Sequence, residues 1–528
     1  MIRRLWAVSD GWIGVLIVFA VALAVYWFEA LAWPLQRGRD SWDYWLYYLQ
    51  LLDRHPVFWA VMLFRTPLTP LVTGIPMSIG GAQLLEVVMS LVYAAAIAGW
   101  AWAARPFGRV TALVTAVVAL ALLPYAAMFH EVSSDFLFGA LLAPWTGLVV
   151  RAGLRPTARV VVGVGVLTAA LTLTRPAGQV LVLAAVAAAL IARGSGRVRL
   201  ARLGIAAAAA IVPLLLWAGL NAIRYDDFTV ARGGKAWVPF FKVLSLKTIE
   251  PSNGAASRRF AAAIERDVLT LPEYRRLHVD LETYLRSPSN LEAIRLIALS
   301  DRDFGRSSNY NILFDTSWEA IRHRPSAYVD SVARTFWHFL WFRFSLEPVR
   351  REPPPPPGPR VLYVDGKPRP SPEAVSPLAQ AASYGFVWCP TDAIDRCIFR
   401  HPAQVFPSES KQRRYVELTE RVRGWNGQLP LRDGVRWLEA KLGTLSWDLP
   451  TAPIVWIVIA GIGIAMRRPR GWPTLVVLSA AGLVVLFVHA LSQEPQSEFS
   501  IPLTPLFALA AIAAVLGRRT DSATVPES

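Results

Sequence analysis

The sequence predicts an α-helical polytopic membrane protein with about ten transmembrane helices and one large extracytoplasmic domain. Three observations support this class. Of the 528 residues, 54% are hydrophobic and only 17% are charged, and the mean hydropathy is +0.38. The apolar residues form runs long enough to cross a bilayer. Arginines cluster between alternate runs, as they do in loops that stay in the cytoplasm.

The apolar runs define the elements in order. The first, at 11–34, is too long for a cleavable signal sequence and predicts a span that anchors the chain. The further predicted spans are 84–104, 110–129, 136–150, 160–173, 177–192, 203–220, 452–466, 472–491 and 501–516. The large polar segment is thus inserted between the seventh and eighth predicted spans.

The basic clusters set the orientation. They lie at 105–109, 151–159, 193–202, 467–470 and 518–519, in alternate connections. All of them are cytoplasmic if Met1 is cytoplasmic, which satisfies the positive-inside rule and places both termini in the cytoplasm.

This orientation gives the expected domains. Residues 1–221 form a seven-span module, whose first outer loop, 35–83, carries juxtamembrane helices. Residues 222–450 form the extracytoplasmic domain, which a proline linker at 353–357 divides in two. Residues 451–518 form the three C-terminal spans, and 519–528 form a cytoplasmic tail.

The charge and the cysteine and histidine content limit the classes of binding partner that we expect. The net charge of +16 comes from arginines between apolar runs, a pattern that favours contact with anionic lipid heads over nucleic acid. Cys389 and Cys397 both lie in the predicted outer domain, and their spacing leaves a disulfide and two reduced thiols equally open. The histidines are scattered and neither cysteine has a metal-ligand spacing, so we predict no metal cluster.

The first candidate site lies in the first outer loop. Arg39 and Asp40 follow the first span, and Asp43 starts a polar stripe with Tyr47 and Gln50 if the segment is helical. The stripe would let the remaining aromatic and leucine surface rest among lipid headgroups, which holds two acids where a lipid-borne substrate presents its own head. The alternative is that Asp40 only caps the helix that begins near Ser41.

Further titratable residues stand in later outer connections. His130, Glu131 and Asp135 occupy the turn between the third and fourth spans, where they are either functional or ordinary helix N-terminal residues. Arg175 stands alone between the fifth and sixth spans. A guanidinium there suits a phosphate ligand, whereas the alternative is a side chain that reaches to the interface.

Together these motifs resemble the GT-C membrane glycosyltransferases, the superfamily that includes protein mannosyltransferases and bacterial aminoarabinose and arabinosyl transferases. Asp40 matches the family's acidic motif after the first span. The segment 130–135 is similar to its second acidic patch, 174–176 to its basic turn and 499–502 to its aromatic-x-x-Pro pattern. Many members carry two adjacent acids in the first loop, whereas Ser41 follows Asp40 here. The large outer insertion matches no part of the family's pattern.

The resemblance implies sugar transfer from a polyprenyl-phosphate donor to a glycan, lipid or protein acceptor, in cell-envelope or cell-wall biogenesis at a bacterial-type plasma membrane. The lipid-linked sugar would be the co-substrate, and no other cofactor is assigned; participation of a divalent cation is left open. We expect Asp40 to deprotonate the acceptor hydroxyl while Arg175, with Arg39, His130 or a divalent ion, holds the departing phosphate. Asp43, Glu131 and Asp135 are the other acids of the expected site. Direct displacement would invert the anomeric centre.

Three other functions remain open at this level. One is a transporter or flippase of lipid-linked sugars. Another is a polysaccharide ligase that uses a lipid-diphosphate-linked glycan. The third is a purely structural scaffold whose outer domain binds a partner.

Overall fold

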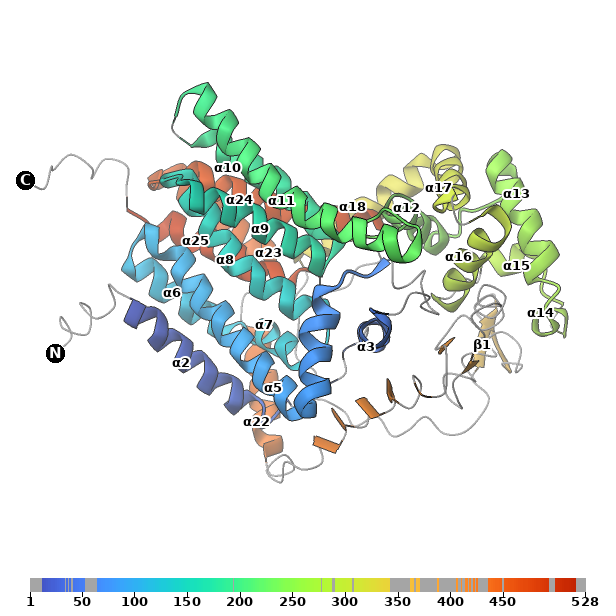
Figure 1. The fold of residues 1–528 in the computed structure, drawn as a ribbon, viewed down its shortest axis with the longest axis horizontal. Helices are drawn as coiled ribbons and strands as arrows, with labels where there is room; N and C mark the ends of the chain where they lie inside the picture. Colours follow the sequence, from blue (N-terminus) through green and yellow to red (C-terminus); the bar gives the residue numbers. More distant parts are fainter. Residues whose placement is uncertain are drawn as a thin grey trace, which may run out of the picture.

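The computed structural model describes residues 12–33, 35, 36, 38, 41–52, 64–192, 194–276, 278–286, 290–305 and 308–341, short pieces between 361 and 425, and 435–448, 451–492 and 499–518. A helical bundle and a smaller group of helices beside one of its ends make up this part (Figure 1). The proline linker at 353–357, Cys389 and Cys397 lie outside the described residues.

The bundle is built from apolar helices of different lengths. They are α2 (Trp12–Glu29), α5 (Leu68–Ala104), α6 (Arg109–Ala121), α7 (Leu123–Ala127), α8 (Ser134–Leu154), α9 (Ala158–Thr174), α10 (Leu181–Ile191), α11 (Gly196–Tyr225), α23 (Pro453–Arg467), α24 (Trp472–Ser492) and α25 (Thr504–Leu516). The helix α5 packs on α2 and α8, α9 packs on α8 and α11, and α25 packs on α23 and α24. The helix α25 is buried along most of its length, so it lies in the core of the bundle.

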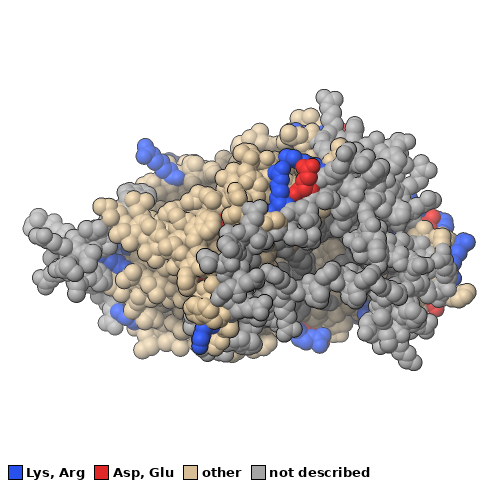
Figure 2. Space-filling model, turned by 90° about the horizontal axis from the view of Figure 1, so that it is seen from below, with Lys and Arg blue, Asp and Glu red and all other residues tan. Residues whose placement is uncertain are grey.

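Every predicted span holds a helix, but the helices differ in length. Among the described residues, four helices are long and apolar enough to cross a membrane, or five if the bent pair α6 and α7 counts as one span. The shorter apolar helices have 10–17 residues. The total of about ten spans therefore stays a prediction. On the face shown in Figure 2, the bundle half presents a broad surface of residues other than Lys, Arg, Asp and Glu.

Two of the predicted spans differ from the observed helices. The helix α5 begins at Leu68, within the predicted outer loop 35–83, and runs through Pro76 to a kink at Gly81, where φ is +67°. Proline and glycine are tolerated in membrane helices because neighbouring groups satisfy the freed backbone. The predicted span 110–129 is instead bent by 66° between α6 and α7. Pro124 lies in the first turn of α7, where its missing N–H costs no helical bond.

The arginine-rich connections meet at one end of the bundle, which we call the basic end. The N–H of Arg470 donates to the carbonyl of Arg518 at 2.7 Å, and that of Arg518 donates to the carbonyl of Phe107 at 3.3 Å. The guanidinium of Arg151 donates to the carbonyl of Trp102 at 3.0 Å. The alternation of basic clusters in the sequence thus corresponds to a shared end of the helices.

A group of shorter helices follows α11. They are α12 (Gly234–Ser245), α13 (Ala255–Ala263), α14 (Pro272–Arg276), α15 (Leu281–Arg286), α16 (Asn290–Phe304), α17 (Asn311–His323) and α18 (Pro325–Trp341). Four short strands follow: β1 (Val361–Val364) pairs antiparallel with β2 (Lys367–Pro370), and β3 (Val387–Trp388) pairs parallel with β4 (Val405–Phe406). The helix α22 (Arg436–Asp448) contacts α7.

Polar contacts join this group to the bundle. The phenol of Tyr328 in α18 donates to the carbonyl of Leu491 in α24 at 3.1 Å. Arg232, which follows α11, is fully buried between Asp227 and Asp301, at 3.0 and 3.1 Å. A buried guanidinium needs such partners, because removing one would leave an uncompensated charge.

Candidate functional site

The first outer loop lies against the turn between α7 and α8. The N–H of Gln36 donates to the carbonyl of His130 at 2.7 Å, and the N–H of Val132 donates to the carbonyl of Gln36 at 3.1 Å. These bonds form a parallel β-bridge between Gln36 and Glu131. Main-chain hydrogen bonds therefore hold together two motifs, at Gln36 and Glu131, that are far apart in the sequence.

Gly38 allows the two segments to approach closely. A Cβ atom at this position would lie 2.7 Å from the carbonyl oxygen of Val132 and 3.5 Å from the Cβ atom of Glu131. Arg39 and Asp40, which follow Gly38, lie outside the described residues. The N–H of Ser41 donates to the carbonyl of Gly38 at 3.1 Å, and α3 (Ser41–Gln50) begins there.

The helix α3 buries the polar stripe that the sequence predicts for it. Its Tyr47 and Gln50, two members of the predicted polar stripe, are 3% and 0% exposed. The helix packs on α5, and the ring of Tyr48 occupies the space that a side chain at Gly74 would fill. Protein therefore covers the face that carries the predicted polar stripe, whereas the position of α3 relative to the membrane stays a prediction. The side chain of Asp43 lies outside the described part.

Asp135 and Arg175 form an ion pair between two helices. Ser133 caps α8 by accepting the N–H of Asp135 at 3.2 Å, which places the carboxylate of Asp135 in the first turn. Arg175 ends α9, and its Nη1 atom contacts the Oδ1 atom of Asp135. Each side chain is only 14% exposed. The helix dipole of α8 also favours a negative charge at this position.

Aromatic residues from the last outer connection complete the surroundings of Arg175. The guanidinium lies 5.1 Å from the ring centroid of Phe499, a distance at which a cation is attracted to the ring. The ring centroid of Phe499 lies 4.3 Å from that of His489 and 5.9 Å from that of Phe339. The basic turn and the aromatic-x-x-Pro segment, which the sequence analysis treats separately, thus meet at one place. Glu498, just before Phe499, is outside the described residues.

His130 is buried against the first helix. It is 1% exposed, its ring stacks on that of Tyr26 at 4.2 Å, and its Nε2 atom lies 3.9 Å from Oε2 of Glu29. Glu131, by contrast, is exposed. The structure therefore brings His130 to the interior and Glu131 to the surface of the same turn, next to the first outer loop.

Sequence reasoning overlooked two acids. Glu29, at the end of α2, is 3% exposed, and Glu86, in α5, is fully buried. The indole N–H of Trp425 donates to the carboxylate of Glu86, and the guanidinium of Arg421 donates to the carbonyl of Met77 in the same helix at 3.1 Å. A single acid within an apolar run was the available signal, because ionisable residues in membrane helices are costly and mark functional or paired positions.

Within the part of the chain that the structure covers, no three His, Cys, Asp or Glu side chains are grouped so that they could hold a metal ion. The groups described around Arg175 are its own guanidinium, the carboxylate of Asp135 and the aromatic ring of Phe499. Such a set can bind an anion and accept a proton without a metal.

Comparisons with known proteins give matches in structure alone. No family model matches the sequence, and no curated protein matches it. Two solved structures of ArnT from Cupriavidus metallidurans are similar to the chain, one bound to undecaprenyl phosphate and one in the apo state. Each is 14% identical to this chain, and each match covers 95% of this chain. The matches cover 78% and 77% of the two ArnT chains, with TM-scores of 0.35 and 0.32.

Proposed function

We propose that this chain is a GT-C type membrane glycosyltransferase, which moves a sugar from a polyprenyl-phosphate donor to an acceptor hydroxyl on the extracytoplasmic side. The observation that supports this function is the placement of Arg175. It lies between Asp135 and Phe499, and Asp135 follows the turn 130–132, whose main chain hydrogen-bonds to Gln36. Arg175 from the end of α9 and Asp135 from the start of α8 are thereby paired at the end of the bundle opposite the basic end.

Arg175 is the proposed ligand of the donor phosphate. A guanidinium has five N–H donors, and the bond to Asp135 uses one of them. Asp135 orients the side chain, and the ring of Phe499 covers it without neutralising its charge. Charge-assisted bonds from arginine to phosphate are strong when the pair is partly desolvated. Arg39 and His130, from the same two segments, are the other proposed ligands of the phosphate.

Asp40 is the proposed general base. It follows Gly38 by two residues, and Gly38 packs on Val132, beside Glu131. The acceptor O–H bond breaks as its proton passes to the carboxylate, and the oxygen forms a bond to the anomeric carbon. The bond from that carbon to the phosphate breaks, and its electron pair leaves with the polyprenyl phosphate. Attack opposite the leaving group inverts the anomeric centre. Asp43 and Glu131 are the alternative bases.

Binding of the donor's phosphate can be tested without knowing the sugar. Undecaprenyl phosphate is titrated into the purified chain, with undecaprenol as the ligand that lacks phosphate. We expect Arg175→Gln to weaken binding of the phosphate roughly tenfold to hundredfold, since a hydrogen bond to a charged group contributes about 1.5 to 3 kcal/mol. Arg224→Gln is the matched control, because Arg224 bonds to the carbonyl of Leu51 near the same end. Equal affinity of both variants would exclude Arg175 as the ligand.

Turnover tests the base and separates the alternatives. With a labelled polyprenyl-phosphate sugar, we expect Asp40→Asn to lower transfer roughly 10²- to 10⁴-fold, the usual contribution of a positioned base, while binding of undecaprenyl phosphate is kept. Near-normal transfer by the folded variant would remove Asp40 from the mechanism. A ligase would use the diphosphate-linked glycan instead, and a flippase would move the lipid across a vesicle membrane without changing it.

A further inference from the structure

The helix α18 is fixed to one end of α24, where the bundle meets the group of shorter helices (Figure 1). The phenol of Tyr328 donates to the carbonyl of Leu491 at 3.1 Å, and the ring centroid of Phe336 lies 5.9 Å from that of Phe487. Leu491 and Phe487 belong to the last turns of α24, which ends at Ser492. Two turns of α18 are therefore held against the same end of one helix.

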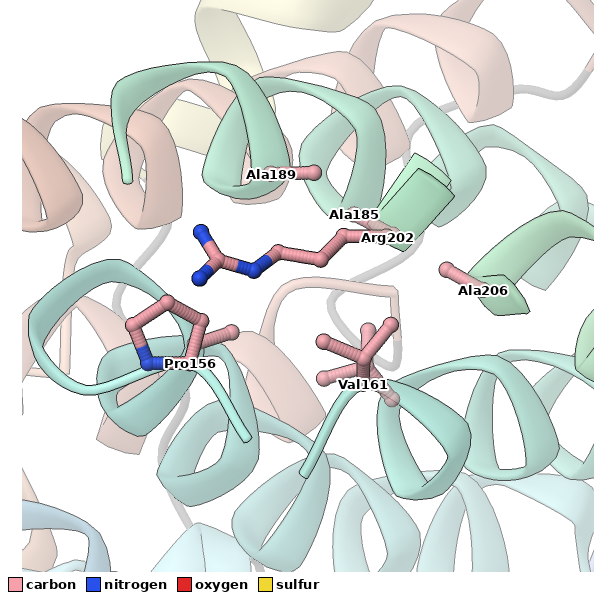
Figure 3. Close-up of a pocket in the computed structure, with 8 residues that line it drawn as sticks. Pro156, Val161, Ala185, Ala189, Arg202 and Ala206 are labelled. Atoms are coloured by element: carbon pink, nitrogen blue, oxygen red, sulfur yellow. The ribbon is translucent and has the colours of Figure 1, made fainter. Parts of the chain in front are cut away.

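The length of α24 places this contact near a boundary of the bilayer. The helix has 21 residues and is apolar enough to cross a membrane, and its length of roughly 32 Å matches a hydrocarbon core of about 30 Å. It begins just after Arg470, at the basic end of the bundle. At that end the side chain of Arg202 extends between Pro156 and Ala189 (Figure 3). The end of α24 that contacts α18 therefore lies near the headgroups on the opposite side.

Another side of α18 is apolar and exposed. Val329, Trp337 and Trp341 are 62%, 58% and 52% exposed, and their spacing of eight and four residues places them along one face of the helix. The ring centroids of the two tryptophans are 5.5 Å apart. Two exposed indoles beside each other make an apolar patch, and such a patch indicates contact with a partner or with a membrane.

Charged residues run along the same helix beside the tryptophans. Asp330, Arg334 and His338 recur every four residues, and all three are exposed. Charged side chains are costly in hydrocarbon. Tryptophan, in contrast, is enriched among lipid headgroups, where its ring lies in a less polar layer and its N–H reaches a polar one. The headgroup layer suits both sets of residues, whereas neither water nor hydrocarbon does.

The apolar patch on α18 adjoins the exposed surface of α24. Phe487, whose ring contacts Phe336, is itself 46% exposed. Acyl chains cover such a surface on a helix that crosses a membrane. Phe487 lies a little more than one turn before the end of α24 at Ser492, or roughly 7 Å along the helix axis. Interfacial helices bury their apolar face to a similar depth.

We propose that α18 is an interfacial helix whose Val329, Trp337 and Trp341 lie among the lipid headgroups at the end of the bundle opposite the basic end. Its partner is the bilayer, because the patch adjoins a side chain of α24 that acyl chains cover. Phe339, on a different side of α18, lies 5.9 Å from Phe499, the ring beside Arg175. The helix thus sets the depth of Arg175 relative to the headgroups. This proposal stands whether or not the chain transfers a sugar.

The test measures the depth of Trp337 in the full-length chain, reconstituted in phosphatidylcholine vesicles. The acyl chains carry bromine, which quenches tryptophan, either close to the headgroup or close to the terminal methyl group. The emission of Trp337 is the difference between the unmodified chain and Trp337→Phe. We expect the shallow bromine to quench this emission at least about twofold more than the deep bromine, as for an interfacial residue. Iodide on both sides of the membrane should quench it little.

Trp318→Phe provides the matched control. Trp318 is 46% exposed, belongs to α17 and lies 5.2 Å from the guanidinium of Arg322. We expect iodide to quench the emission of Trp318 and neither brominated lipid to do so, because its exposed ring lies beside a charge that prefers water.

Three results would overturn the proposal. Quenching of Trp337 by iodide and not by bromine would place the patch in water. Stronger quenching by the deep bromine would make α18 part of a membrane span. Quenching by neither would show that protein covers the patch, from a partner or a second copy of the chain. Trp341→Phe gives the same measurement if Trp337→Phe does not fold. A failure of Arg175→Gln to weaken binding of undecaprenyl phosphate would refute the proposed function and leave this result unchanged.

Discussion

The ion pair of Asp135 with Arg175 should be strongly coupled in the free energy of unfolding. Both side chains are 14% exposed. At an effective dielectric constant of about 20, two unit charges about 4 Å apart attract by roughly 4 kcal/mol. Desolvation and the ordering of the arginine offset part of this attraction. We therefore expect a coupling energy of about 2 to 3 kcal/mol between Asp135→Asn and Arg175→Gln.

The coupling is measured as a double-mutant cycle from unfolding in mixed micelles with increasing dodecyl sulfate. The pair of Arg324 with Glu250 provides the control, since it also joins separate elements, at 2.7 Å, but its side chains are 49% and 34% exposed. An exposed pair should couple by about 0 to 1 kcal/mol. The two cycles therefore differ in exposure while the chemistry of the partners is the same.

A coupling for Asp135 and Arg175 no larger than that of the exposed pair would refute the reasoning. It would mean that water screens the contact, and that Asp135 does not hold the guanidinium in place. The proposal that Arg175 is oriented for a phosphate would then lose its support, even if Arg175 itself binds the donor.

Two further predictions concern backbone approach and acid sensitivity. Gly38→Ala should lower sugar transfer roughly a hundredfold by displacing the first outer loop, because the new Cβ atom would meet the carbonyl of Val132. The control is Gly219→Ala, where no atom lies within 4 Å of the new Cβ atom, and it should leave transfer unchanged. Equal effects of the two variants would show that the close approach at Gly38 is unimportant. Burial raises the pKa of Glu319, but bonds from the N–H groups of Ala256 and Ser257 and from the Ser257 hydroxyl outweigh it, so the folded pKa is lowered. The stabilisation from the ionised Glu319 is complete above its unfolded pKa of about 4.3 and is lost as the pH falls through the lower folded pKa. Glu319→Gln should therefore lower the free energy of unfolding by about 1 to 3 kcal/mol at pH 7 and by progressively less in acid. A loss that does not change between pH 7 and pH 3 would contradict the assignment.

The positions of the bundle helices could be predicted because a long apolar run has few alternatives to a helix in lipid. The ends of the helices were harder to predict from the sequence. Pro76 and Gly81 interrupt the apolar pattern before 84, yet α5 continues through both from Leu68. The bend before Pro124 depends on the backbone of Leu122, which has ψ of 77°, and hydropathy carries no information about such a dihedral angle.

The candidate site was predictable as a set of residue types but not as a set of contacts. Asp135 and Arg175 both stood out as charges in outer connections, but their pairing depends on how α8 packs on α9. Tyr47 and Gln50 follow a helical stripe that suggests an exposed face, and tertiary packing on α5 buries them. Glu29 was hidden because its partner, His130, is distant in sequence and comes close only when α2 and the turn before α8 assemble.

The bridge between Gln36 and Glu131 consists of main-chain atoms alone. Side chains at either position can therefore change while the two strands of the bridge stay in register. A neutral replacement such as Glu131→Gln would alter the charge on this exposed turn and leave the loop anchored. Successive substitutions could therefore change the acidity of this surface while the main-chain bridge that supports it is kept.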